Sequence, residues 1–264
     1  MHATSRDALA AVREQLAPES AAEVGTELFS VVTLLDSERG LRRTLADGST
    51  DPDARSGLVG RLFQGKISDA TLAVLTVVVR QQWSSARDVV DSLELLGREV
   101  LLRSAERDGQ LDTVEDELFR LGRIVAASPS LERVLADRSA VAGQRTSLVH
   151  SLLDGKVAAV TSALVTQVVE RLREEPADAF DALSTLAARQ REQSVAHVRS
   201  AVALSDAQLE RLTRTLTTTY GRTVTVHVEV DPALTGGLVV QVGDEVIDGS
   251  VAGRLDALRR RLAG

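Results

Sequence analysis

Apolar residues follow helical spacing through most of the chain and strand spacing only near its C-terminal end. Helical spacing places apolar side chains at i, i+3, i+4 and i+7, so that they line one buried face. Clear examples are Leu28, Val31, Val32 and Leu35, and further along Leu118, Leu121 and Val125. This pattern predicts helical bundles, with short apolar helices at 68–83 and 158–173.

Residues that begin or end helices agree with this pattern. Asp51 and Pro52 suit the N-cap and the first position of a helix that carries Leu58 and Leu62. Gly65 and Gly155 stand where helices should end, so we expect both to adopt left-handed C-cap conformations.

The helical part contains an internal repeat at a constant offset of 90 residues. Residues 27–66 align with 117–156 without a gap, and 15 of the 40 positions are identical. Roughly 4 identities are expected by chance in a chain this rich in Leu, Ala and Arg, so composition does not explain the match. Matching stretches include Glu27–Phe29 with Glu117–Phe119 and Leu45–Asp47 with Leu135–Asp137. We call residues 1–97 copy one and residues 98–197 copy two.

The segment that joins the two copies is expected to form one continuous helix. No helix-ending signal occurs from Ser85 until Gly109. At 1.5 Å per residue such a helix would be about 35 Å long, enough to be the last helix of one bundle and the first of the next. A shared helix would make the two bundles a stiff rod.

Residues 198–264 are predicted to form a small separate module. Ser205 and Gln208 form a capping box ahead of a helix that should end at Gly221. A strictly alternating stretch then predicts a strand with four valines inward, namely Val224, Val226, Val228 and Val230. Further strands are expected from Gly236 to Val242 and at Val246–Ile247, followed by a final helix from about Ser250.

The predicted fold class is therefore mostly α. It comprises two tandem six-helix-type bundles that share a long helix, followed by a small α+β module. Composition agrees, since hydrophobic residues make up 44% of the chain but aromatic residues only 2%. A core of Leu, Val and Ala favours packed helices.

Charge and cysteine content narrow the possible functions. The net charge of −7 argues against a nucleic-acid partner, whose phosphates require a basic face. The absence of cysteine excludes disulfides, thiolate metal sites and cysteine nucleophiles. The most apolar run, Ala70–Val79, is about half the ~20 residues that a spanning helix needs, and the N-terminus does not resemble a secretory signal. We expect a protein that is cytoplasmic or sits on the cytoplasmic face of a membrane.

Residues capable of catalysis or metal binding are scattered. No histidine has a partner at metal-ligand spacing, and no phosphate-binding loop, nucleophile elbow or dinucleotide fingerprint occurs. Asp244, Glu245 and Asp248 could in principle bind a cation, but a charged turn before a helix N-terminus explains them better. We therefore expect no catalytic residue, no metal site and no cofactor.

An ordered set of motifs near the C-terminus is specific. It comprises Val198–Ala201 followed by Leu204 and Ser205, and then residues 230–250 with a paired glycine and Asp-Gly-Ser before a Leu-rich terminal helix. This set closely resembles the delta subunit of F-type ATP synthases, whose mitochondrial counterpart is the oligomycin sensitivity-conferring protein. Residues 98–195 also resemble the N-terminal six-helix bundle of that family. Residues 1–97 exceed the usual pattern, and the repeat explains them as an additional bundle.

The resemblance implies a structural, non-catalytic role in the peripheral stalk. Its helical bundle would bind the N-terminal amphipathic helix of an alpha subunit, and its C-terminal module would bind the end of the stalk b subunit. Together these contacts would hold the alpha/beta head against the torque of the rotor during proton-driven ATP synthesis. The resemblance implies no nucleic-acid partner and no direct insertion into the membrane. The complex would lie at the cytoplasmic face of the plasma membrane.

The resemblance also implies contact residues. The family's alpha-binding groove lies between the first and fifth helices of the bundle, here about 98–107 and 158–173. Candidates for this contact are Leu101, Leu102, Ala105, Val160, Leu164, Val165 and Val168. Candidates for the b-subunit contact are Leu238, Val240, Val251, Leu255, Leu258 and Leu262. Each of these residues could instead pack the interior of its own domain.

Other functions stay open at this point. The chain could be a generic helical adaptor unrelated to ATP synthase, or an enzyme that uses Asp231, Asp244 or Asp248. For copy one, bracing of the stalk is favoured over binding a second alpha helix, because Trp83 stands where copy two has Arg173.

Overall fold

The computed structural model describes residues 2–17, 20–137, 142–193, 195–220, 224–243 and 245–250. The contacts divide the chain into two compact units, Met1–Ser184 and Thr185–Gly264. Among the described residues there are twelve helices and one four-stranded sheet, which confirms the predicted fold class.

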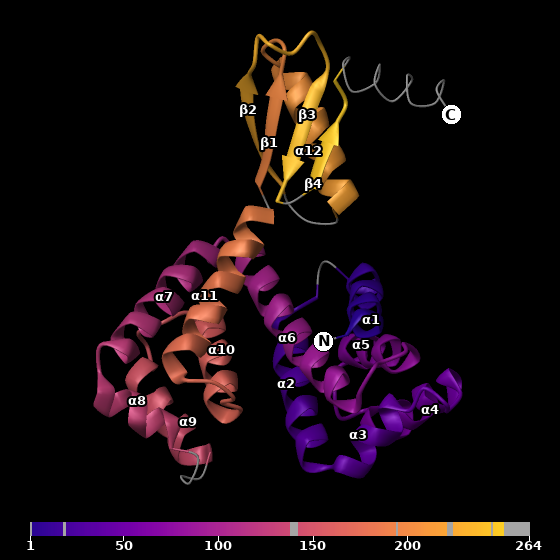
Figure 1. Cartoon of the computed structure of the whole chain (residues 1–264), viewed down its shortest axis with the longest axis vertical. Coiled ribbons are helices and arrows are strands. Elements are labelled where there is room, and N and C mark those ends of the chain that lie inside the picture. Colours follow the sequence, from indigo (N-terminus) through magenta and orange to yellow (C-terminus); the bar gives the residue numbers. More distant parts are fainter. Residues whose placement is uncertain are drawn as a thin grey trace. The chain divides into compact units, whose positions relative to one another are not determined.

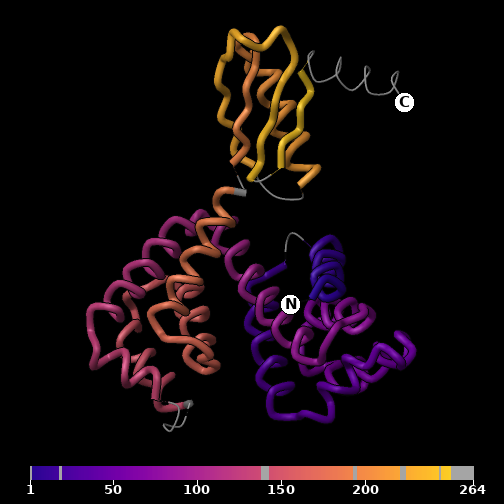
Figure 2. Tube along the Cα trace, in the orientation of Figure 1, coloured from indigo at the N-terminus to yellow at the C-terminus, as the bar shows by residue number. Residues whose placement is uncertain are grey.

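Helices account for the regular structure of unit one, in the order that the repeat predicts (Figure 1). Copy one contains α1 (Ala3–Gln15), α2 (Ala22–Ser37), α3 (Arg39–Ala46), α4 (Pro52–Phe63), α5 (Asp69–Arg80) and most of α6 (Ala86–Arg107). Copy two continues with α7 (Leu111–Ala126), α8 (Pro129–Ala136), α9 (Ala142–Leu153), α10 (Ala159–Glu170) and α11 (Pro176–Gln193). Figure 2 shows the same course as a trace, with α6 running on from copy one into copy two.

Helix caps lie where the sequence places them. The Asp51 carboxylate accepts hydrogen bonds from the backbone N–H groups of Asp53 and Ala54, with Pro52 in the first turn. Gly65 and Gly155 follow α4 and α9 with φ of 75° and 67°, conformations that favour glycine. Both left-handed caps are confirmed.

The long helix α6 is continuous from Ala86 to Arg107, as predicted. It lies very close to α2, because glycines from each helix face the other at the crossing. A Cβ atom added to Gly97 would lie 2.6 Å from Cε1 of Phe29, and one added to Gly25 would lie 2.7 Å from Cγ of Leu101. The two glycines therefore allow α2 and α6 to pack backbone to backbone.

The core of copy one is built from aliphatic residues of α1 to α6, with one tryptophan. Trp83 is buried in this core, and its indole N–H donates a hydrogen bond of 2.8 Å to the carbonyl oxygen of Val78. Trp83 is thus an interior residue just beyond α5 and does not shape a binding surface, so the contrast with Arg173 no longer supports bracing of the stalk.

Unit two contains the end of α11 and a four-stranded sheet. Its elements are β1 (Val195–Ser200), α12 (Asp206–Tyr220), β2 (Thr225–Val230), β3 (Leu238–Val242) and β4 (Glu245–Asp248). The strand order is β2-β1-β3-β4, with β1 parallel to β2 and the other pairs antiparallel. The capping box is present, since the Ser205 N–H donates to Gln208 Oε1 and the Gln208 N–H donates to Ser205 Oγ.

One face of the sheet is covered by α12. The small core there contains Ala196, Val198, Leu216, Val224, Val240 and Val242. The predicted alternation of β2 is correct in phase, but its inward residues are only partly covered. Val224 is buried, whereas Val228 and Val230 are 36% and 48% exposed among the described residues. The final helix expected from Ser250 lies outside the described residues.

The domain boundaries expected from the sequence fall inside elements of the structure. The boundary at residue 97 lies within α6, and the boundary at residue 197 lies within β1. The contacts place the division after Ser184, inside α11.

Candidate partner-binding surfaces

The first candidate surface lies where α6 and α10 pack against each other. The seven residues predicted for the alpha-subunit contact lie on these two helices, which are in contact: Leu101, Leu102 and Ala105 on α6, and Val160, Leu164, Val165 and Val168 on α10. All seven are buried, with exposed fractions between 0% and 8%. In the chain alone they are interior residues, and their contact with a partner stays a prediction.

Copy one contributes to this burial. Leu101 packs on Gly25 of α2, and α2 also contacts α10. At the end of α10, Val168 borders an open hollow of about 420 Å³ whose other lining residues include Glu94, Arg98 and Arg171. A partner helix that enters between α6 and α10 therefore has to separate packed side chains.

Copy one has its own apolar hollow between its first and fifth helices. It is small, about 120 Å³, and it is lined by α1, the residues that follow it, and α5. At the offset of 90, Val12 and Val74 in this hollow correspond to Leu102 and Leu164 of the predicted groove in copy two. The repeat thus places a related surface on each bundle.

The second candidate surface is on the sheet of unit two. Val240 is buried and Leu238 is half-buried, and both belong to the small core beneath α12. The other four residues predicted for the b-subunit contact, Val251, Leu255, Leu258 and Leu262, lie outside the described residues. On the same face, the edge strands expose further apolar residues, including Val230 (48%) and Ile247 (42%). These were missed as contact candidates, although Ile247 is in register with Val240 and Val230 lies on the same face at the opposite edge of the sheet.

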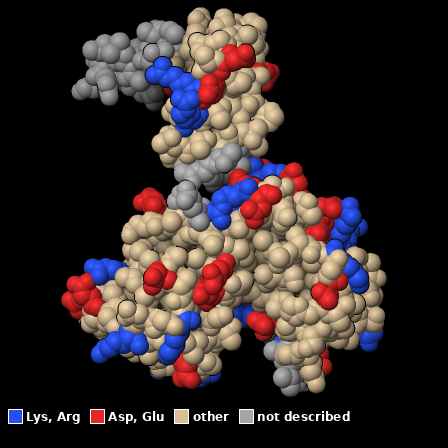
Figure 3. Space-filling model, turned by 180° about the vertical axis from the view of Figure 1, so that it is seen from behind, with Lys and Arg blue, Asp and Glu red and all other residues tan. Residues whose placement is uncertain are grey.

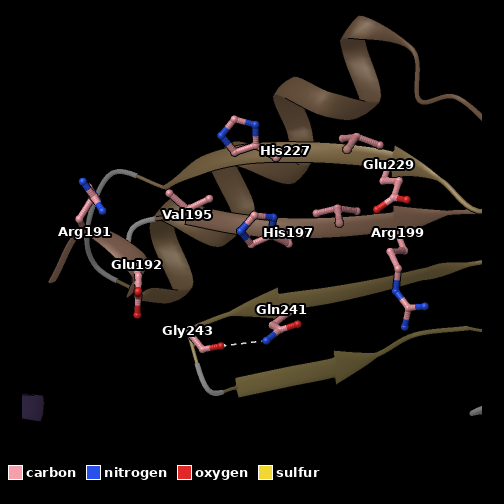
Figure 4. Close-up of a pocket in the computed structure, with 11 residues that line it drawn as sticks. Arg191, Glu192, Val195, His197, Arg199, His227, Glu229, Gln241 and Gly243 are labelled. Atoms are coloured by element: carbon pink, nitrogen blue, oxygen red, sulfur yellow. Dashed lines mark hydrogen bonds between the residues drawn. The ribbon is translucent and has the colours of Figure 1, made fainter. Parts of the chain in front are cut away.

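The opposite face of the sheet is open and carries a pair of stacked imidazoles. His197 and His227 are neighbours in the β1–β2 register, with ring centroids 6.0 Å apart and an interplanar angle of 23°. They line a hollow of about 830 Å³ together with Arg199, Glu229 and Gln241 (Figure 4). The outward direction of His227 is confirmed. Its stacking on His197 depends on the strand pairing, which the sequence pattern does not reveal.

Two of the three carboxylates considered for catalysis, Asp231 and Asp248, form hydrogen bonds within turns. Asp231 accepts a hydrogen bond from the Ala233 N–H and forms an ion pair with Arg199. Asp248 accepts hydrogen bonds from Ser250, which hold the pKa of Asp248 below its usual value. Asp244 lies outside the described residues. Within the described ranges, no group of three or more His, Cys, Asp or Glu side chains is arranged to hold a metal ion.

Surface charge marks no further site on the face that Figure 3 shows, whereas two exposed apolar residues of α7, Phe119 (52%) and Ile124 (58%), lie outside both candidate surfaces. Figure 3 shows acidic and basic side chains interspersed over the visible face of unit one. None of the helices, as far as the chain is described, combines the length and the apolar character needed to cross a membrane.

Comparisons with known proteins agree with the motifs at the C-terminus. A family described as "ATP synthase delta (OSCP) subunit" matches residues 98–262. Proteins named "ATP synthase subunit delta" match the chain over its whole length. The protein from Rhodococcus opacus is 56% identical to this chain, and the alignment covers 99% of each of the two chains. The protein from Nocardia farcinica is 52% identical, and the alignment covers 100% of each chain.

One solved structure is a more distant match. A chain from the mitochondrial ATP synthase hexamer of Toxoplasma gondii aligns with 63% of this chain and 95% of its own, at 19% identity and a TM-score of 0.32.

Proposed function

The chain belongs to the ATP synthase delta (OSCP) subunit family, and from this premise we propose that it is a stator subunit of an F-type ATP synthase. In this role it links the alpha/beta catalytic head to the b subunit of the peripheral stalk and resists the torque of the rotor. It is a structural subunit and not itself a catalyst.

The observation that carries the proposal is the full-length match to proteins named ATP synthase subunit delta. The matches to the proteins from Rhodococcus and Nocardia span 99% to 100% of both chains, so copy one is part of the shared sequence. The division of the chain into two compact units also supports the proposal, because a linking subunit needs separate surfaces for separate partners.

We propose that the N-terminal helix of an alpha subunit binds at the α6–α10 surface. The apolar character of its seven residues suits the apolar face of an amphipathic helix. Because all seven are buried in the chain alone, the proposal includes an opening of the α6–α10 contact when the helix enters. The free energy of that opening reduces the observed affinity relative to a preformed groove.

We propose that the b subunit binds unit two. The exposed apolar residues at both edges of the sheet, including Val230 and Ile247, favour burial against a partner. Leu238 and Val240 contribute from β3, one of the two inner strands, together with the four candidates beyond residue 250. The assembled protein would associate peripherally with the cytoplasmic face of the plasma membrane through these partners.

Reconstitution tests the proposed function. The purified chain is added to catalytic heads and to membrane sectors that contain the b subunit, both stripped of their delta subunit. We expect it to restore binding of the heads to the membranes and ATP-driven proton pumping. Recovery of neither, with a correctly folded chain, would favour the generic adaptor.

A companion assay addresses catalysis. The chain alone, free of alpha and beta subunits, should hydrolyse no ATP. Turnover that copurifies with the chain would contradict a structural role.

A further inference from the structure

A cluster of charged side chains joins the two copies where α2, α6 and the end of α10 meet. We call it the interbundle cluster and define it as Asp36, Asp91, Glu94, Arg98, Arg171 and Arg173. Asp36 lies on α2, and Asp91, Glu94 and Arg98 lie on α6. Arg171 and Arg173 follow α10 in copy two. The cluster therefore spans both bundles.

Arg171 is at the centre of this cluster. Its guanidinium forms ion pairs with Asp36 and Glu94, and it approaches Asp91 at 3.6 Å. Its Nη2 also donates to Asp36 Oδ1 at 3.2 Å, so the contact with Asp36 is bidentate. A planar guanidinium suits such a two-point contact in a way that an ammonium group does not.

Neighbouring side chains complete the arrangement around Glu94. Arg173 pairs with Asp91 at 2.6 Å, and Arg98 pairs with Glu94. The Gln167 side chain of α10 donates to Glu94 at 2.9 Å and accepts from Arg98 at 2.9 Å. Each contact of Gln167 and Arg173 crosses from copy two to α6.

The two residues at the centre of the cluster are largely removed from water, whereas the others are partly exposed. The side chains of Arg171 and Glu94 are only 12% and 9% exposed. Burial lowers the pKa of Arg171, whereas its hydrogen bond to Asp36 raises it, and burial lowers the pKa of Arg98 to about 10. Buried charges are tolerated when they are paired, so loss of one partner leaves the others uncompensated.

Comparison of the two copies favours a role for these residues in the contact between the bundles, because the equivalent positions of the other copy mostly lack charge. The carboxylates Glu27 and Glu117 are retained in both copies and make the same contacts in each. Most positions of the interbundle cluster lack their charge in the other copy. The counterparts at the offset of 90 are Ala126 for Asp36, Ser184 for Glu94, Ala188 for Arg98, Gln81 for Arg171 and Trp83 for Arg173. The exception is Asp91, whose counterpart Asp181 keeps the carboxylate, so at five of the six positions the charge is present only where the two copies face each other.

We propose that Arg171 is a positioning residue that locks copy one onto copy two and makes the two bundles one rigid body. Both α2 and α10 pack on α6. The direct contact between α2 and α10 is much smaller than that between α2 and α6, so rotation of the bundles about α6 has to be prevented by a specific link between the two helices. The Asp36–Arg171 pair is such a link. The proposal depends on the proposed function in one respect: the rigid pair of bundles would bear the torque that acts on a stator subunit.

The test measures the distance between the bundles in the isolated full-length chain. Because the chain has no cysteine, spin labels can be attached at Arg61→Cys and Ser151→Cys. These are exposed positions of α4 and α9 that are equivalent in the repeat. Pulsed electron paramagnetic resonance should give a narrow distribution of the distance between the two labels in the parent chain. In Arg171→Met the distribution should become broad, because the bundles can then change their relative position.

A matched control separates the lock from a general loss of ion pairs. Arg80→Met breaks an ion pair with Asp53 that lies wholly inside copy one, and it should keep the narrow distribution. The conservative variant Arg171→Lys keeps a positive charge beside Asp36 and Glu94, so it should recover part of the narrow distance distribution that Arg171→Met loses. A merely structural role of Arg171 would not produce this recovery.

Each outcome decides the proposal. An unchanged distribution in folded Arg171→Met overturns it. If that variant loses its helical circular dichroism, the milder Asp36→Asn carries the test, since Asp36 is 30% exposed. A narrow distribution in Asp36→Asn would then refute the lock. The measurement involves no other ATP synthase subunit, so its failure is independent of the stator assignment.

Discussion

The carboxylate of Glu27 accepts hydrogen bonds from the backbone N–H of Ser68, at 2.9 Å and 3.1 Å, and so holds the first turn of α5. The equivalent carboxylate of Glu117 accepts from the backbone N–H of Ala158 at the start of α10. A hydroxyl one turn further on completes each contact, Thr71 in copy one and Thr161 in copy two. The two bundles therefore use one device to fix the fifth helix to the second.

Replacing Glu27 with Gln should lower the free energy of unfolding by about 1–2 kcal/mol, because a charged acceptor at a helix N-terminus is lost. Glu23→Gln removes an exposed carboxylate from the first turn of α2, where it interacts only with the helix dipole, and should cost less, about 0.3–1 kcal/mol. Urea denaturation of both variants measures the difference. Equal stability of the two variants would mean that the contact contributes nothing.

The same contact predicts a pH dependence. Burial raises the pKa of Glu27, but hydrogen bonds from Ser68 and Thr71 lower it by more, so it lies below its ordinary value of 4.5. A depressed folded-state pKa gives stability that is present above pH 4.5 and is lost as the pH falls through the folded value. Glu27→Gln should therefore lose stability relative to the parent at pH 7, and the difference should shrink below pH 4.5. A difference that stays constant with pH would exclude this origin.

Packing of α2 on α6 gives a separate prediction. Gly97→Ala should destabilise the chain by about 1–3 kcal/mol, because the added methyl group meets the Phe29 ring. Gly57→Ala provides the control, since nothing lies within 4 Å of its added Cβ atom, and it should stabilise by about 0.5–1 kcal/mol through helix propensity. Phe29→Leu combined with Gly97→Ala should recover part of the loss, measured as a double-mutant cycle. Additive losses would show that Phe29 and Gly97 are not coupled.

Local signals in the sequence were sufficient for much of the fold. Caps such as Asp51 and Gly65 determine where helices begin and end through hydrogen bonds to their own neighbours, so they could be predicted. The continuity of α6 followed in the same way, from the lack of an ending signal before Gly109.

Features that depend on distant partners were not predictable. Strand β1 follows α11 without a breaker, and its extended conformation is fixed by pairing with β2 and β3. Phe29 and Phe119 are identical at equivalent positions of the repeat, yet they are 8% and 52% exposed. Phe29 packs against Gly97, whereas the equivalent position in copy two is Ala187. Likewise, the spacing of 158–173 gave no sign that Arg171 would pair with a carboxylate 135 positions earlier.

Binding of an alpha-subunit peptide should be detectable by amide hydrogen exchange. A peptide of the first ~20–25 residues, about 30 Å or more as a helix, is added to the full-length chain. We expect exchange to change in 98–107 and 159–170, because the buried α6–α10 contact has to open. Val168→Asp should weaken binding, since a carboxylate there would be desolvated without a partner. Circular dichroism checks that this variant is folded.

The alternative outcome is equally specific. Protection confined to α1 and α5 would place the peptide in the apolar hollow of copy one around Val12 and Val74. That result would contradict the assignment to copy two and would show that the additional bundle recognises the alpha subunit.

Thermal unfolding followed by two probes gives the last prediction. Trp83 is the sole tryptophan of the chain and is buried in copy one, so its fluorescence reports the unfolding of that bundle. Far-UV circular dichroism reports mainly the helices of both copies, with a smaller contribution from α12 of unit two. If Arg171 locks the bundles into one cooperative body, the two probes should give the same midpoint in the parent chain. In Arg171→Met the bundles should unfold separately, because the interbundle cluster no longer couples them, and the two midpoints should diverge. Arg80→Met should leave the midpoints coincident. Two separate midpoints in the parent chain would contradict the proposal. They would show that copy one and copy two unfold independently even with the Asp36–Arg171 pair intact.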